Sequence, residues 1–253
     1  PRWRGAVDQR ALNGIAPVPQ QIERIGFNPF DVAPPSSQSV PVNVQIFLRH
    51  FQRSPRHVHP GYLRTATSQM QREPDPVPRW IVVSAGTGGT SATLGRYIRY
   101  AGAQRDETEL AVVDPENSVF LDYYNSGDAS LTLERGSRIE GIGRPRVEPS
   151  FLPSVIDRMI RVADADTMAA LRLLEKLLGR RCGGSTGTNF VGALQLMAEM
   201  KAAGETGPVV TLICDGGERY AGSYYDDAWI AAQKLDIAPA LAKLKRLVDT
   251  GHA

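Results

Sequence analysis

The stretch Trp80-Ile81-Val82-Val83-Ser84-Ala85 is apolar and runs directly into the glycine-rich turn Gly86-Thr87-Gly88-Gly89-Thr90. A helix-like stretch, residues 91–100, follows this turn. The order of strand, glycine-rich turn and helix start is typical of a phosphate-binding site, because glycine lets the backbone approach an anion and the first amides of the helix point toward it. Such a turn also occurs where a helix merely packs close to a strand, so the rest of the chain must decide its role.

The chain beyond residue 76 repeats the alternation of apolar strand and helix. We expect strands at residues 81–85, 109–114, 158–162 and 209–214, and helices at residues 90–102, 116–125, 167–178, 189–203, 226–233 and 238–248. This alternation indicates an α/β fold with a mostly parallel sheet and helices on both faces. Ligands of such sheets bind at the carboxyl ends of the strands. We therefore expect three glycine-rich loops, residues 86–90, 183–188 and 215–217, to meet at that edge.

The first 75 residues have a different character. Twelve of the 18 prolines lie within residues 1–80, and no lysine does. Proline interrupts helices and central strands, so we expect residues 1–75 to be poorly ordered or packed as irregular coil. Residues 39–51 are the exception, since their apolar pattern fits one strand or a short helix. We therefore divide the chain into an irregular segment, residues 1–75, and an α/β domain, residues 76–253.

The composition sets broad limits on function. The 253 residues are 42% hydrophobic and 22% charged, with a formal net charge of +2, which favours neither a nucleic acid nor a membrane as partner. No apolar run approaches the roughly 20 residues that cross a bilayer, and we expect no secretory leader. Cys182 and Cys214 are the only cysteines, and we expect reduced thiols, a cytoplasmic protein and no metal site. His57 and His59 lack nearby carboxylates or cysteines that would complete a ligand set.

Five ordered motifs carry a family resemblance. They are Gly86-Thr87-Gly88-Gly89-Thr90, Asp114-Pro115-Glu116-Asn117-Ser118, Glu140-Gly141-Ile142-Gly143, Gly183-Gly184-Ser185-Thr186-Gly187 and Gly216-Gly217-Glu218-Arg219-Tyr220. Together they resemble the cysteine synthase/cystathionine β-synthase family, whose members have the tryptophan synthase β-subunit-like fold and use pyridoxal 5′-phosphate. The run at residues 135–151 is most similar to the cysteine desulfhydrase branch. The resemblance covers about residues 68–235 and implies a fold that is incomplete at its N-terminal side.

The resemblance implies a cofactor site and a reaction. The residues that would hold pyridoxal phosphate are Gly86, Thr87, Gly88, Gly89, Thr90, Gly141, Ser185 and Asp215. The first five would bind the phosphate, Ser185 the pyridine nitrogen, Gly141 would leave room over the cofactor face, and Asp215 would lie by the ring edge. The implied activity is that of a lyase or transferase of cysteine metabolism. It would eliminate or replace the β-substituent of cysteine or an O-acetylserine-like substrate, in a homodimer.

One expected residue is missing, so we assign no catalytic residue. The family's Schiff-base lysine stands early in the chain, whereas the only lysines here are Lys176, Lys201, Lys234, Lys243 and Lys245. None has the family's sequence context. We therefore expect a fragment or rearranged copy in which residues 1–75 replace the lysine-bearing half, as translation in a shifted frame would produce. A genuine accessory segment is the alternative.

Two other functions stay open. Without the lysine, the chain would act as a non-catalytic module that binds pyridoxal phosphate or another phosphate ligand. A nicotinamide-dinucleotide site is a further reading of Gly86-x-Gly88, but the third glycine of that pattern would fall at Ser91. Among the other polar residues, we expect Arg144 and Arg146 to steer an anionic substrate or to form surface pairs. Tyr224 and Tyr225 are expected as packing residues with hydrated hydroxyls.

Overall fold

In the computed structural model, residues 44–48, 77–102 and 108–251 are described. They form one five-stranded sheet in the order β1-β5-β2-β3-β4, and every neighbouring pair is parallel. The strands are β1 (Val44–Leu48), β2 (Trp80–Ser84), β3 (Glu109–Pro115), β4 (Arg158–Val162) and β5 (Val209–Ile213). The prediction of an α/β fold with a parallel sheet is confirmed. All carboxyl ends therefore meet at one edge.

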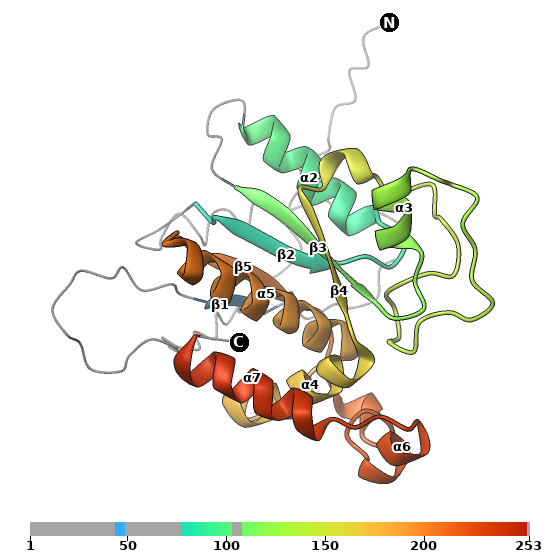
Figure 1. Cartoon of the computed structure of the whole chain (residues 1–253), viewed down its shortest axis with the longest axis vertical. Coiled ribbons are helices and arrows are strands. Elements are labelled where there is room, and N and C mark those ends of the chain that lie inside the picture. Colours follow the sequence, from blue (N-terminus) through green and yellow to red (C-terminus); the bar gives the residue numbers. More distant parts are fainter. Residues whose placement is uncertain (1–43, 49–76, 103–107, 252–253) are drawn as a thin grey trace, which may run out of the picture.

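Helices cover both faces of this sheet (Figure 1). They are α2 (Gly89–Gly102), α3 (Phe120–Ser126), α4 (Asp164–Leu178), α5 (Gly184–Ala203), α6 (Asp227–Ala232) and α7 (Ala238–Thr250). Two single-turn 3₁₀ helices, η2 (Pro153–Val155) and η3 (Glu218–Tyr220), complete the described elements. No described helix combines the length and the apolar composition that crossing a bilayer requires.

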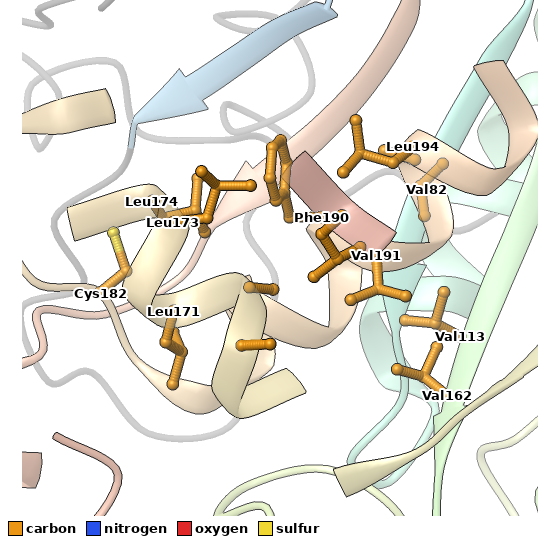
Figure 2. Close-up of a cluster of buried hydrophobic side chains, with 14 of the residues drawn as sticks. Val82, Val113, Val162, Leu171, Leu173, Leu174, Cys182, Phe190, Val191 and Leu194 are labelled. Carbon is orange, nitrogen blue, oxygen red and sulfur yellow. The ribbon is translucent and has the colours of Figure 1, made fainter. Parts of the chain in front are cut away.

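The side chains of β2, β3, β4 and β5 alternate between two buried clusters. Val82, Val113 and Val162 point toward α4 and α5, where Phe190, Val191 and Leu194 of α5 lie against them (Figure 2). Val83 and Val112 point the opposite way and pack with Leu94 of α2 and Phe120 of α3. A sheet buried on both faces explains why its strands read as continuous apolar runs. Cys182 is fully buried in the first cluster, as expected for a small apolar filler.

Three helix starts differ from the prediction by more than one residue. The helix expected at residues 116–125 begins at Phe120, because Asn117 takes a left-handed conformation (φ 56°) that a helix excludes. The helix expected from residue 167 already begins at Asp164. The largest difference is at α5, which begins at Gly184, so residues 184–188 are helix and not loop. Here close packing outweighs the low helix propensity of glycine: a Cβ on Gly187 would lie 2.8 Å from the Thr167 carbonyl oxygen of α4.

Strand β1 lies within the range that was expected to be irregular. Val44–Leu48 pairs with Val209–Ile213 in register, so the open alternative for residues 39–51 resolves to a strand in its described part. Residues 1–43 and 49–76 lie outside the described residues. The expected irregular coil there, like the domain boundary at residue 75, stays a prediction.

Candidate functional site

The turn at residues 86–90, here called the Gly86 turn, joins the end of β2 to the start of α2. The first hydrogen bond beyond this turn runs from the Ala92 amide to the Gly88 carbonyl oxygen, over 2.9 Å. No described residue accepts a hydrogen bond from the main-chain amides of Thr87 to Ser91. These amides lie at the positive end of the α2 dipole, so the turn presents several donors to an anion.

The Gly86 turn is tightly packed on one side and open on the other. Gly88 has a φ of 90°, and a Cβ built on it would lie 2.7 Å from the Phe151 nitrogen. A Cβ on Gly86 would overlap the carbonyl oxygen of Gly141. By contrast, a Cβ on Gly89 would meet no atom within 4 Å in the part of the chain that the structure describes. The open side at Gly89 is where a ligand could approach the free amides.

The loop at residues 137–143, here called the Gly141 loop, packs against the Gly86 turn. The Gly143 amide donates to the Ala85 carbonyl oxygen over 2.8 Å, which ties the loop to the end of β2. Gly141 has a φ of 87°, and a Cβ built on it would meet no atom of a described residue within 4 Å. Ile139 is buried at 1% exposure and anchors the loop in the core. Gly86 and Gly141, both predicted cofactor residues, are therefore in direct contact.

The first turn of α5 packs against the far side of the Gly141 loop. A Cβ on Gly184 would lie 2.8 Å from Ile139 and 2.8 Å from the Tyr224 ring. Ser185 comes next and is 8% exposed. The Cys214 amide donates to the Thr186 hydroxyl over 3.1 Å, so the start of α5 is fixed to the end of β5. Burial raises the pKa of the Cys214 thiol, while hydrogen bonds from Ser185 and Thr186 oppose that shift.

Asp215 lies just beyond β5, and its carboxylate packs against Gly183. Any Cβ at Gly183 would overlap this carboxylate, and the Gly183 amide donates to the Asp215 carbonyl oxygen over 2.9 Å. The Tyr220 hydroxyl donates to Asp215 Oδ2 over 3.0 Å. Burial raises the pKa of Asp215, and the Tyr220 hydrogen bond opposes it. Burial and then the Asp215 charge raise the pKa of Tyr220, so its hydroxyl stays protonated and donates.

An ion pair between Arg219 and Glu140 links the Asp215 segment back to the Gly141 loop. Both side chains are about half exposed, and the Arg219 guanidinium lies 5.0 Å from the Tyr220 ring centre. A continuous series of contacts therefore runs from Gly86 to Gly141, then to the start of α5, and on to Asp215. The three glycine-rich segments that the sequence placed at the carboxyl edge are connected in this way.

Tyr224 contributes to the site in a way that sequence reasoning missed. Its hydroxyl accepts from the Glu140 amide over 2.8 Å and donates to the Arg138 carbonyl oxygen over 3.0 Å. The Tyr225 hydroxyl likewise bonds both the amide and the carbonyl of Cys182, over 2.9 and 2.8 Å. The expectation of hydrated hydroxyls was wrong for both. No local pattern could have shown these bonds, because their partners are distant in sequence.

The five lysines lie on α4, α5 and α7 or in the turn after α6. Lys176 and Lys201 are in the last turns of α4 and α5, whose first turns adjoin the carboxyl edge. The Lys201 ammonium donates to the Thr250 carbonyl oxygen over 2.8 Å. Lys234, Lys243 and Lys245 are exposed. None of the contacts that join the Gly86 turn, the Gly141 loop and Asp215 involves a lysine of the described chain.

Comparison with known proteins agrees with this architecture. Residues 46–215 match the family described as pyridoxal-phosphate dependent enzyme, a span that begins within β1 and ends at Asp215. The chain is 57% identical over 176 residues to L-cysteine desulfhydrase Cds1 of Mycobacterium tuberculosis, covering 70% of this chain and 47% of that protein. It is 32% identical over 154 residues to cysteine synthase 1 of Emericella nidulans, covering 60% and 40%. Cystathionine beta-synthase of Rattus norvegicus is 28% identical over 150 residues, covering 59% and 25%.

The chain thus spans half or less of the length of these curated relatives. The family match covers about two thirds of the chain. The expected resemblance to cysteine desulfhydrase, cysteine synthase and cystathionine β-synthase is confirmed. The chain belongs to the family of pyridoxal-phosphate dependent enzymes.

Proposed function

We propose that this chain binds pyridoxal phosphate at the carboxyl edge of its sheet, with the phosphate on the Gly86 turn. The main-chain amides from Thr87 to Ser91 support this, because they have no acceptor among the described residues and a phosphate needs several such donors. The empty space beside Gly89 and Gly141 supports it further, since a Cβ at either position would enter that space. The Thr87 and Thr90 hydroxyls would add to the amides.

The residues around the ring have distinct proposed roles. Bound pyridoxal phosphate supplies an electron-withdrawing ring that weakens the bonds at the α-carbon of an amino acid. Ser185 would offer a neutral hydroxyl to the pyridine nitrogen, and Asp215 would lie by the ring edge. Gly141 would keep the face above the ring open for substrate. The contacts that connect these residues through the Gly141 loop and Gly183 are the observation that carries the proposal.

For the whole protein, the proposed reaction is β-elimination from cysteine, as the name of the mycobacterial relative indicates for that protein. β-Replacement, as in the cysteine synthases, is the related possibility, and a small amino acid is the substrate class in either case. A cytoplasmic homodimer is part of the proposal. The apolar side of α7 packs within the chain, through Leu244, Leu247 and Val248, so a second copy would have to dock elsewhere.

A second candidate function is favoured by the position of the lysines. An imine with pyridoxal phosphate needs an amine that reaches the cofactor. Because the five lysines lie on α4, α5 and α7 or in the turn after α6, this chain alone would hold the cofactor through its phosphate without a covalent bond. It would then act as a binding module or an inactive relative.

Titration with pyridoxal phosphate tests both candidates. We expect saturable binding that inorganic phosphate competes away, and no cofactor mass on the protein after borohydride reduction. A reduced adduct on one of the five lysines, together with sulfide release from cysteine, would favour turnover by this chain over the binding module. Absence of saturable binding would refute the proposed site. Gly86→Val, which forces a side chain into the Gly141 carbonyl, serves as the variant in which the site is broken.

A further inference from the structure

Asp164 is a buried carboxylate that the proposed chemistry does not use. It is the first residue of α4, and its side chain has no solvent exposure. Oδ2 accepts from Arg138 Nη1 over 2.6 Å, whereas Oδ1 has no hydrogen-bond partner among the described residues. Burial raises the pKa of Asp164 to about 6, the nearby Glu116 charge adds to the rise, and Arg138 opposes it. The fold therefore keeps a charge inside the protein at a cost in stability.

The partner of this carboxylate begins the functional part of the Gly141 loop. Arg138 is held twice: its side chain by Asp164, and its carbonyl oxygen by the Tyr224 hydroxyl over 3.0 Å. The same hydroxyl accepts from the Glu140 amide over 2.8 Å. Tyr224 is itself fixed, because its ring is buried and stacks on Tyr220 with 4.6 Å between ring centres. The position of Arg138 thus determines where the next residues of the loop lie.

The other end of the loop is attached directly to the Gly86 turn. The Gly143 amide bonds to Ala85, and the Gly141 carbonyl oxygen lies against Gly86. A shift at Arg138 would therefore reach Gly86 through only a few residues of main chain. The exposed ion pair between Arg219 and Glu140 constrains the Gly141 loop more weakly, because surface ion pairs contribute little to stability.

We propose that Asp164 is a positioning residue: through Arg138 it holds the Gly141 loop against the Gly86 turn, and neutralising its charge loosens the loop. The inference rests on the proposed function only in taking the Gly86 turn as the phosphate site. It explains why an unfavourable buried charge is present at the start of α4. A neutral side chain there would remove the desolvation cost but also the charge-assisted bond to Arg138.

Among the described residues, few charged or titratable groups face Asp164. Arg138 comes from the Gly141 loop, Glu116 from the turn after β3, and Tyr224 from the segment after η3. Burial raises the pKa of Tyr224, so its hydroxyl stays protonated at neutral pH. Protonation of Asp164 on acidification would weaken its bond to Arg138, and we expect the Gly141 loop to loosen as the pH falls through about 6.

Hydrogen exchange of the cofactor-free protein, read by mass spectrometry, tests this inference. At about pH 8 we expect the peptide containing Glu140 and Gly143 to exchange about tenfold faster in Asp164→Asn than in the wild type. Asp166→Asn is the matched control, because it removes a carboxylate from the same first turn of α4 and should exchange like the wild type. At about pH 5 the wild type should approach Asp164→Asn. Arg138→Gln removes the other partner and should exchange fast at both pH values.

The outcomes separate this inference from the proposed function. If Asp164→Asn and Arg138→Gln both exchange like the wild type at about pH 8, Asp164 does not position the loop. If Asp164→Asn does not fold, Arg138→Gln and the pH dependence of the wild type decide the matter. Equal protection of the β3 peptides in all variants excludes global loosening. Failure of the wild type to bind pyridoxal phosphate would refute the proposed function and leave the exchange result intact.

Discussion

Gly88→Ala should destabilise the protein more than a glycine-to-alanine substitution at any other position of the Gly86 turn. Gly88 has a φ of 90°, and its added Cβ would lie 2.7 Å from the Phe151 nitrogen and 2.8 Å from the Phe151 Cβ. The left-handed backbone costs a residue with a Cβ about 1–2 kcal/mol. Overlap with a packed main chain adds about 1–3 kcal/mol, because Phe151 is buried and stacks on Phe120. We expect a total loss of about 2–5 kcal/mol in the free energy of unfolding.

Gly127→Ala provides the matched control. Gly127 has a similar φ of 72°, but a Cβ there would meet nothing within 4 Å. Gly127→Ala should therefore lower the free energy of unfolding by about 1–2 kcal/mol, through the backbone conformation alone. Urea unfolding followed by tryptophan fluorescence and far-ultraviolet circular dichroism measures both variants. Equal losses for Gly88→Ala and Gly127→Ala would show that the approach of Phe151 does not constrain the turn, and the packing argument for the Gly86 turn would be wrong.

Three further predictions concern the cofactor, the start of α6 and pH. Gly89→Ala adds a methyl group in open space, so thermal stability should hold or rise slightly while affinity for pyridoxal phosphate falls about tenfold; unchanged affinity would argue against a phosphate at that place. Asp226→Ala removes the cap that accepts from the Ala228 and Trp229 amides, and should lower the free energy of unfolding by about 1 kcal/mol in a urea titration. Because the pKa of Asp164 is raised to about 6 in the folded state, the folded protein binds a proton there before the unfolded chain does. We therefore expect the difference in unfolding free energy, wild type minus Asp164→Asn, to increase by about 2 kcal/mol from about pH 7.5 to about pH 4. A decrease in this difference would contradict the raised pKa of Asp164.

The central strands could be predicted from the sequence because the pattern that identifies each strand lies in consecutive residues. Buried strands such as β3 and β5 are continuous apolar runs bounded by turn residues, and glycine follows closely after the carboxyl ends of β2 and β5. The contact between Gly86 and Gly141 could be expected from the family resemblance, since both residues belong to motifs that the resemblance assigns to the cofactor site. The phosphate-binding role of the Gly86 turn was predicted from its sequence, and that role stays a prediction.

The features that could not be predicted from the sequence depend on contacts between residues that are far apart along the chain. The role of residues 39–51 was open because the strand Val44–Leu48 is defined by its pairing with Val209–Ile213. The glycine-rich start of α5 was assigned to a loop on propensity, but close packing against Ile139 and Leu171 favours glycine at residues 184 and 187 of this helix. The Arg138–Asp164 pair and the Tyr224 hydroxyl bonds join segments far apart along the chain.

The strand order has a consequence for synthesis. Strand β5 is the last of the five to leave the ribosome, yet it lies between β1 and β2 in the finished sheet. Strand β1 has no other described strand as neighbour, so Val44–Leu48 must wait unpaired until residue 213 has emerged. A nascent chain that stalls before this point would expose the edge of β2 as well, and both edges would be open to pairing with other chains. Expression at reduced translation speed should therefore lower the yield of native protein.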